Sequence, residues 1–168
     1  TALKHDLDEI YEHFTSKKLY ENNFHRVLGS YSIYYSKDPE NVFNIIKRIL
    51  KQDGLFFFCG PSMDNNLEIR EFHYSLKGEN VPEDVGAGTF MEKSGQELAR
   101  KFFNKVETFT FQNPMQFDSA DALYNYWSSY NLYDSRLDAA FKEAANEHFK
   151  KNGAFETVKR VIGVKATK

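Results

Sequence analysis

The sequence lacks the features that mark several classes of protein. Its 168 residues include one cysteine, Cys59, which rules out an intramolecular disulfide and a cysteine zinc cage and suits a reducing compartment. The longest apolar run, residues 55–59, is far too short to span a bilayer, and residues 1–8 do not resemble a signal peptide. Lys and Arg (22) nearly balance Asp and Glu (24), so no positive field attracts nucleic acid or an anionic membrane. We therefore expect a cytoplasmic protein with neither partner.

Motifs of several enzyme classes are also missing. The five histidines, at positions 5, 13, 25, 73 and 148, have no metal-ligand spacing, so we expect no metal site. Ser62 lacks the Gly-x-Ser-x-Gly elbow of hydrolases. Cys59 ends an apolar run and is predicted to be an inert core thiol rather than a nucleophile.

The sequence does contain enough apolar and aromatic residues to form an ordered hydrophobic core. Hydrophobic residues make up 41% of the chain and aromatic residues 16%, which excludes a disordered protein. The length predicts one domain, residues 1–168.

The best-marked segment predicts a β-α-β unit. Residues 26–35 are rich in β-branched and aromatic side chains, as is typical of a strand. Asp38 is placed to cap a helix whose first turn holds Pro39 and whose end is marked by Gly54. The run 55–59 is apolar on both faces, as a buried parallel strand requires. We therefore predict that the two strands lie side by side and parallel, joined by a right-handed crossover.

The rest of the chain alternates helical and extended patterns. Apolar periodicity predicts further helices over residues 3–14, 64–76, 93–103, 119–130 and 135–151. Two more strands are predicted over residues 106–111 and 156–166. The sequence therefore predicts a layered α/β fold with four strands.

Residues 24–35, the pair Asp38-Pro39 and residues 48–55 (Arg-Ile-Leu-Lys-Gln-Asp-Gly-Leu) together resemble a class I S-adenosylmethionine-dependent methyltransferase. In that family a phrase of the type FDxVxSxxxxxY forms the fourth strand, and a helix ending in RxLKPGG leads into the fifth. Here His25 replaces the frequent Asp, and Gln52-Asp53 stand where Pro-Gly is commoner. The resemblance implies a partial Rossmann-like sheet, mostly parallel with an antiparallel last strand, with helices on both faces.

The resemblance also implies that part of the family's domain is missing. The strand, glycine-rich loop and helix that hold the cofactor have no counterpart before Phe24. We interpret the chain as the carboxyl-terminal part of a larger methyltransferase domain, whose exposed sheet edge a homodimer or a separate amino-terminal half would cover. Residues 83–90 (Glu-Asp-Val-Gly-Ala-Gly-Thr-Phe) look superficially like the missing loop. Because polar residues and Pro82 precede them, we interpret them as a surface loop.

The candidate site lies where the strands of the β-α-β unit end, because open α/β sheets place their ligands there. By the resemblance, Ser30, Tyr31 and Ser32 lie near the methionine part of S-adenosylmethionine, and Tyr35 lies near the methyl acceptor. The alternative is an ordinary tyrosine-rich strand.

The loop after residues 55–59 borders the same crevice. Its polar residues Ser62 and Asn65 are candidates for orienting a polar acceptor, whereas Asp64 is predicted to cap the next helix.

The aromatic-rich segment 112–134 has two interpretations. In the family this region often forms a lid over the acceptor, for which Trp127 and Tyr130 would supply aromatic walls. Leu123, Trp127 and Tyr130 also have helical spacing, however, and this favours a core position for Trp127.

Three functions remain open. The first is methyl transfer from S-adenosylmethionine to a small-molecule acceptor, an in-line displacement that requires alignment rather than a fixed catalytic motif. Tyr35 and His73 are its candidate proton acceptors. The second is a non-catalytic scaffold or interaction subunit, consistent with the missing glycine-rich loop. The third is a flavodoxin-like binding module, which requires that residues 86–88 lie between a strand and a helix.

Overall fold

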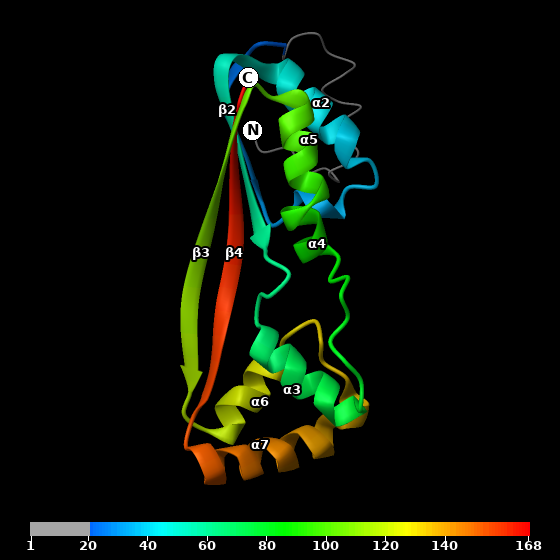
Figure 1. Ribbon diagram of the computed structural model, residues 1–168, viewed down its shortest axis with the longest axis vertical. Coiled ribbons are helices and arrows are strands. Elements are labelled where there is room, and N and C mark those ends of the chain that lie inside the picture. Colours follow the sequence, from blue (N-terminus) through cyan, green and yellow to red (C-terminus); the bar gives the residue numbers. More distant parts are fainter. Residues whose placement is uncertain (1–20) are drawn as a thin grey trace, which may run out of the picture. The chain divides into compact units, whose positions relative to one another are not determined.

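The computed structural model describes residues 21–168, so the predicted helix 3–14 lies outside the described residues. The chain forms two compact units. The described residues of unit 1 are 21–63, 84–111 and 161–168, and unit 2 comprises residues 64–83 and 112–160. The four predicted strands form one sheet (Figure 1). Their order in the sheet is β1 (Phe24–Ser30), β2 (Leu50–Pro61), β4 (Phe155–Thr167) and β3 (Lys105–Phe117).

Unit 1 holds most of the sheet and the helices beside it. Its complete elements are β1 (Phe24–Ser30), η2 (Ile33–Tyr35), α2 (Pro39–Ile49), β2 (Leu50–Pro61), α4 (Ala87–Glu92) and α5 (Ser94–Phe102). Unit 2 contains α3 (Leu67–Lys77), α6 (Ala120–Ser128), η3 (Ser135–Leu137) and α7 (Asp138–Asn152). Strands β3 (Lys105–Phe117) and β4 (Phe155–Thr167) contribute to both units.

The predicted β-α-β unit is present. Strands β1 and β2 pair in parallel, with Val27 opposite Phe56 and Ser30 opposite Cys59, and α2 connects them. A parallel pair needs such a crossover because the chain must return to the same end of the sheet before the second strand begins. The central prediction from the sequence is confirmed.

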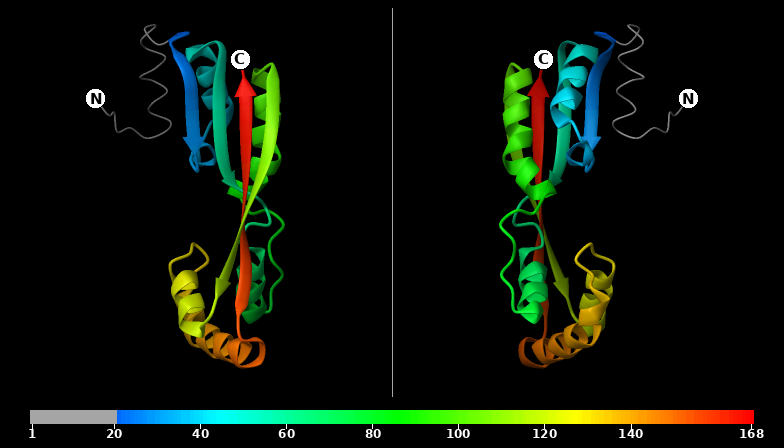
Figure 2. Two further views of the ribbon diagram at one scale, coloured as in Figure 1. Left: turned by 90° about the vertical axis from the view of Figure 1, so that its left-hand side faces the viewer. Right: turned by 90° about the vertical axis from the view of Figure 1, so that its right-hand side faces the viewer.

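The last strand runs against its neighbours, as the family resemblance implied. Strand β4 pairs antiparallel with β2, from Leu55 opposite Thr167 to Pro61 opposite Val161. Strand β3 lies on the other side of β4 and points the opposite way (Figure 2). The strand latest in sequence is thus inserted between two earlier ones.

Helix α2 begins as predicted but ends earlier. The Asp38 carboxylate accepts a hydrogen bond from the Asn41 backbone N–H at 3.0 Å, which caps the helix. The expectation that Gly54 ends the helix is wrong, because Leu50 is already extended and starts β2. Gly54 lies inside that strand, where a Cβ would come within 2.8 Å of the Lys51 carbonyl oxygen. The glycine therefore serves close backbone packing.

Other element bounds also shift. Helix α3 begins at Leu67 rather than residue 64, and β3 continues to Phe117 rather than ending at residue 111. The predicted helix 135–151 divides into a short 3-10 turn and α7. Ser119 caps α6 by accepting from the Ala122 N–H at 3.2 Å.

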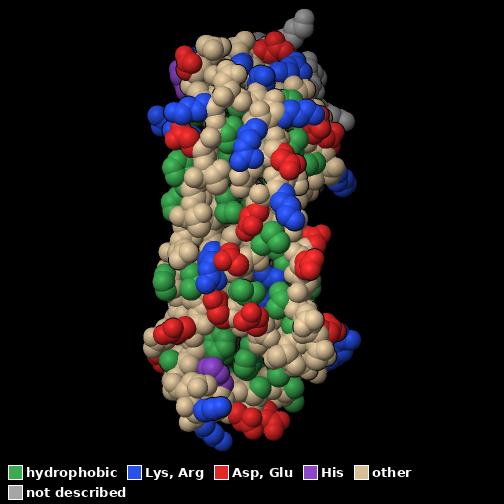
Figure 3. Space-filling view, viewed as in Figure 1, with side chains coloured by type: hydrophobic (Ala, Val, Ile, Leu, Met, Phe, Trp, Pro, Cys, Tyr) green, Lys and Arg blue, Asp and Glu red, His purple; other side chains and the backbone are tan. Residues whose placement is uncertain are grey.

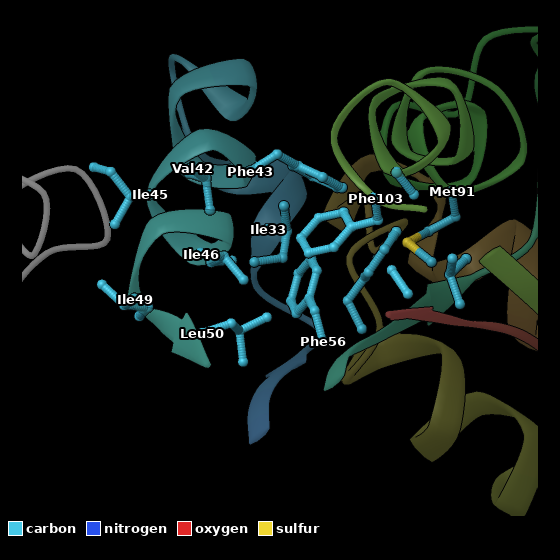
Figure 4. Close-up of a cluster of buried hydrophobic side chains, with 14 of the residues drawn as sticks. Ile33, Val42, Phe43, Ile45, Ile46, Ile49, Leu50, Phe56, Met91 and Phe103 are labelled. Atoms are coloured by element: carbon cyan, nitrogen blue, oxygen red, sulfur yellow. The ribbon is translucent and has the colours of Figure 1, made fainter. Parts of the chain in front are cut away.

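The core of unit 1 forms where α2, α4 and α5 pack on one face of the sheet (Figures 2 and 4). Phe43 of α2 is fully buried, and its ring lies edge-on to Phe56 at 5.4 Å and to Phe58 at 5.3 Å. Alternate residues of β4, among them Val164, complete this layer.

Unit 2 has its own aromatic core. The Trp127 ring stacks on Phe141 with centroids 4.0 Å apart and planes 8° apart, and both residues are fully buried. The other buried members of this cluster are Ile69, Leu123, Ala145 and Phe155.

We expect Phe43→Ala to lower the free energy of unfolding by about 3–5 kcal/mol, because it removes a buried ring and leaves a cavity between two others. Urea titration measures the loss. The matched control is Tyr35→Ala, whose side chain is 76% exposed and which should lose much less. Equal losses for the two variants would contradict the assigned core.

Candidate functional site

The candidate site lies where the parallel strands β1 and β2 end, within unit 1. The Tyr31 N–H donates to the Cys59 carbonyl at 2.9 Å, one residue beyond the end of β1. Tyr31 has a φ of 51°, a left-handed conformation that strands do not adopt. The expectation that the strand continues to residue 35 is therefore wrong. The chain turns away at Tyr31 and exposes the polar groups that follow.

The turn after β1 is held in place by one buried side chain. Ile33 packs over Gly29 so closely that a Cβ there would lie 2.9 Å from the isoleucine side chain. The Tyr35 N–H donates to the Ser32 carbonyl at 3.0 Å and closes the 3-10 turn. Tyr35 itself is 76% exposed.

The predicted residues Ser30, Tyr31, Ser32 and Tyr35 therefore all lie at this end of the sheet. Cys59 lies beside them and is only half-buried rather than a core residue. Its thiol donates to the Ser30 hydroxyl at 3.6 Å.

Tyr34 belongs to the same end of the sheet and was not predicted from the sequence. Its ring lies 4.7 Å from Tyr35 and 6.4 Å from Phe90, and it fills the space that a Cβ on Gly60 would need. Burial raises the pKa of Tyr34, and the neighbouring Tyr35, Tyr31 and Cys59 raise it further. The phenol therefore stays protonated at neutral pH and can donate a hydrogen bond.

Helix α4 packs against the loop after β2. A Cβ on Gly88 would lie 2.8 Å from both the Ser62 carbonyl oxygen and the Met63 Cα. The Met63 N–H donates to a Glu92 carboxylate oxygen at 2.7 Å, and Ser62 is buried. Gly88 is thus required for close packing. No strand is present in residues 78–86, so the condition set for a flavodoxin-like module is not met.

The remaining predicted residues fall in unit 2. The Asn65 side-chain oxygen accepts from the Arg160 N–H at 3.0 Å. Trp127 is fully buried, which favours its core interpretation. Tyr130 is half-buried and stacks on Tyr126 with centroids 6.1 Å apart. His73 is buried, and its Nδ1 accepts from the Trp127 indole N–H at 3.2 Å.

Asp64 has a different role from the predicted helix cap. The cap position of α3 is Asn66, and Asp64 instead forms an ion pair with Arg160 at 3.3 Å. Arg160 also contacts Glu68 at 2.9 Å. Burial alone would raise the pKa of Glu68, but hydrogen bonds from Arg160, its own backbone N–H, Thr157 and Val158 lower it to about 2. The start of α3 is thereby tied to β4.

Solved structures of other proteins share this arrangement of strands and helices, although the sequence itself matches little. No protein-family model matches the sequence, and no curated protein matches it. Among solved structures, a candidate methyltransferase from Bacillus halodurans C-125 is similar with a TM-score of 0.50 and 15% identity, over 90% of this chain and 73% of that one. A SAM-dependent methyltransferase from Archaeoglobus fulgidus has a TM-score of 0.50 and 11% identity, over 99% of this chain and 66% of that one.

The fold is that of the class I methyltransferases. The chain spans between about two thirds and three quarters of the length of these two neighbours.

The described residues were also compared with the requirements of a membrane span, a metal site and a charged surface patch. Within residues 21–168, no helix is long and apolar enough to cross a membrane, and no cluster of His, Cys, Asp and Glu could hold a metal ion. On the side drawn in Figure 3, acidic and basic side chains are interspersed rather than gathered by sign.

We expect Gly88→Ala to weaken the packing of α4 by about 1–3 kcal/mol, although alanine normally favours a helix. The added methyl group must push against the backbone of residues 62–63. Amide exchange at Met63, which reports its bond to Glu92, should become faster. Glu97→Ala, at an exposed position of the neighbouring helix α5, is the control, because it adds no atoms beside residues 62–63. Unchanged exchange at Met63 in G88A would contradict the close approach.

We expect unit 2 to lose stability as the pH falls below about 6.5. Burial lowers the pKa of His73 and Lys77 lowers it further, against the opposing effects of Asp134 and Glu79. The unfolded histidine takes up a proton at a higher pH than the folded one, so acidification favours unfolding. Protonation also removes the acceptor for the Trp127 N–H. Trp127 fluorescence during urea titration at pH 7.5 and 5.5 measures the effect.

The control for this pH dependence is His73→Gln, which keeps an acceptor for the indole but does not titrate. This variant should show a smaller loss between pH 7.5 and 5.5 than the wild-type chain. Identical losses in both proteins would assign the effect to other groups.

Proposed function

We propose that the chain supplies the carboxyl-terminal part of a cytoplasmic S-adenosylmethionine-dependent methyltransferase that acts on a small-molecule acceptor, with residues 1–168 forming part of one larger domain. The observation that carries this proposal is the strand order β1-β2-β4-β3, with the antiparallel β4 inserted beside the parallel pair. Hydroxyl groups and tyrosine rings gather at the carboxyl ends of that pair, where such sheets bind ligands.

The residues at the end of β1 suit the methionine part of the cofactor. Ser30 and Ser32 provide hydroxyl groups, and the faces of Tyr31 and Tyr34 favour a cationic sulfonium. When bound, S-adenosylmethionine supplies a methyl group on that sulfonium. Our proposal assigns the protein the task of aligning donor and acceptor and of keeping water out.

The adenosine part of the cofactor needs a further segment. The described residues contain no glycine-rich loop between a strand and a helix. Strand β1 stands at one edge of the described sheet, with β2 as its one neighbour there. A separate amino-terminal half of the domain, or a second copy of the chain, would pair with this edge and complete the site.

Fewer residues are proposed to contact the methyl acceptor than to contact the cofactor. Tyr35 is exposed beside the cofactor candidates and is the proposed contact with the acceptor and its candidate proton acceptor. Ser62 is a further proposed contact within unit 1, whereas the candidates Asn65 and Tyr130 belong to unit 2 and are not assigned to this site. Neither Trp127 nor His73 is given this role, because both side chains are buried in the core of unit 2.

Titration of the labelled chain with S-adenosylmethionine, followed by amide NMR shifts, tests the proposal. We expect shifts at Ser30, Tyr31 and Ser32 with the cofactor at millimolar concentration, and similar shifts with methionine. Adenosine alone should leave these amides unchanged, because the segment that holds it is not among the described residues. Shifts confined to other residues, or none at all, would contradict the proposed cofactor site and favour a non-catalytic scaffold.

A further inference from the structure

One face of the sheet in unit 1 carries several exposed apolar side chains and is uncovered by the described residues. Helices α2, α4 and α5 all pack on the other face (Figure 2). We call the uncovered side the open face and define it by the side chains of Leu28, Phe57, Phe109 and Phe111 and by the Glu107–Lys165 pair.

Strand register places these side chains together. Leu28 of β1 lies opposite Phe57 of β2, which in turn lies opposite Lys165 of β4. A Cβ on Gly163 would lie 2.9 Å from the Phe57 ring and 3.0 Å from the Phe111 ring, so both rings extend over this glycine. The open face is therefore continuous across all four strands.

The open face exposes more apolar surface than single scattered residues do. Leu28 is 76% exposed and Phe111 is 53% exposed, whereas Phe56 and Phe58, on the opposite side of β2, are fully buried. Contiguous apolar patches of this kind mark interaction sites in soluble proteins. Parallel strand pairs also normally have both faces covered.

The charges on the open face restrict what can cover it. Lys165 and Glu107 form an ion pair at 3.1 Å, and their side chains are 36% and 34% exposed. The exposed Lys105 also contacts the Glu107 carboxylate, at 3.3 Å. An apolar covering layer would have to bury this pair without offering a polar partner, which is unfavourable. A surface that carries the same pair in the opposite order provides such a partner.

We propose that the open face binds the open face of a second copy of this chain. A two-fold axis brings each Lys165 near the Glu107 of the other copy and sets the exposed phenylalanines against one another. Sheets pack face to face at about 10 Å in this way. Two faces four strands wide and seven residues long bury about 1,000 Å² in total, near the lower size limit of a specific interface. This inference does not depend on methyl transfer.

Light scattering after size-exclusion chromatography of the full chain tests the inference. The wild-type chain, whose mass is 19.6 kDa, should elute as a dimer. Phe111→Glu should raise the dissociation constant at least about tenfold by placing an unpaired charge in the interface. Leu28→Glu should do the same, and since Leu28 is already largely exposed, this variant should keep its fold even if F111E does not.

The matched control is Thr110→Glu, which adds the same charge one position away, where strand alternation directs the side chain to the other face. This variant should remain a dimer with an unchanged circular dichroism spectrum. A monomeric wild-type chain would overturn the proposal and point to another cover, such as helices of an amino-terminal half. A dimer that survives both F111E and L28E would overturn it as well, since it would use another surface.

Discussion

The parallel pairing of β1 with β2 is the constraint on which the rest of the structure depends. It forces α2 to cross over the sheet, and it brings the ends of both strands to one edge. The edge-on contact between the rings of Phe43 and Phe56 packs the crossover helix α2 against the sheet. The antiparallel insertion of β4 next to this pair then produces the methyltransferase strand order.

The parallel pairing of β1 with β2 also leads to the two surfaces at which we propose that other chains or segments bind. One is the edge of β1 away from β2, where we propose that a further strand pairs. The other is the open face, which the one-sided placement of α2, α4 and α5 leaves without a helix from the described residues. The proposed cofactor site at the strand ends and the proposed association through the open face therefore both follow from the topology, although they are tested separately.

The sequence was a good guide wherever local patterns agree with tertiary packing. The Asp38 cap and the doubly apolar run 55–59 predicted the crossover because each signal has one dominant physical cause. The prediction that Gly54 ends the helix was wrong because glycine is favoured both at the end of a helix and where backbone packs closely within a strand. The structure places the predicted residues Ser30, Tyr31, Ser32 and Tyr35 at one end of the sheet. Tyr34 was not predicted, since only the left-handed turn at Tyr31 reveals how the following rings are directed. Asp64 could not be assigned correctly, because its partner Arg160 is distant in sequence.

The parallel register itself is open to direct measurement by nuclear Overhauser effects between backbone protons of the two strands. We predict contacts between Leu28 and Phe57 and between Ser30 and Cys59, because the two strands run in the same direction. Contacts that instead join Arg26 to Cys59 and Ser30 to Leu55 would show strands running in opposite directions. That result would remove the crossover, the methyltransferase fold and the candidate site together.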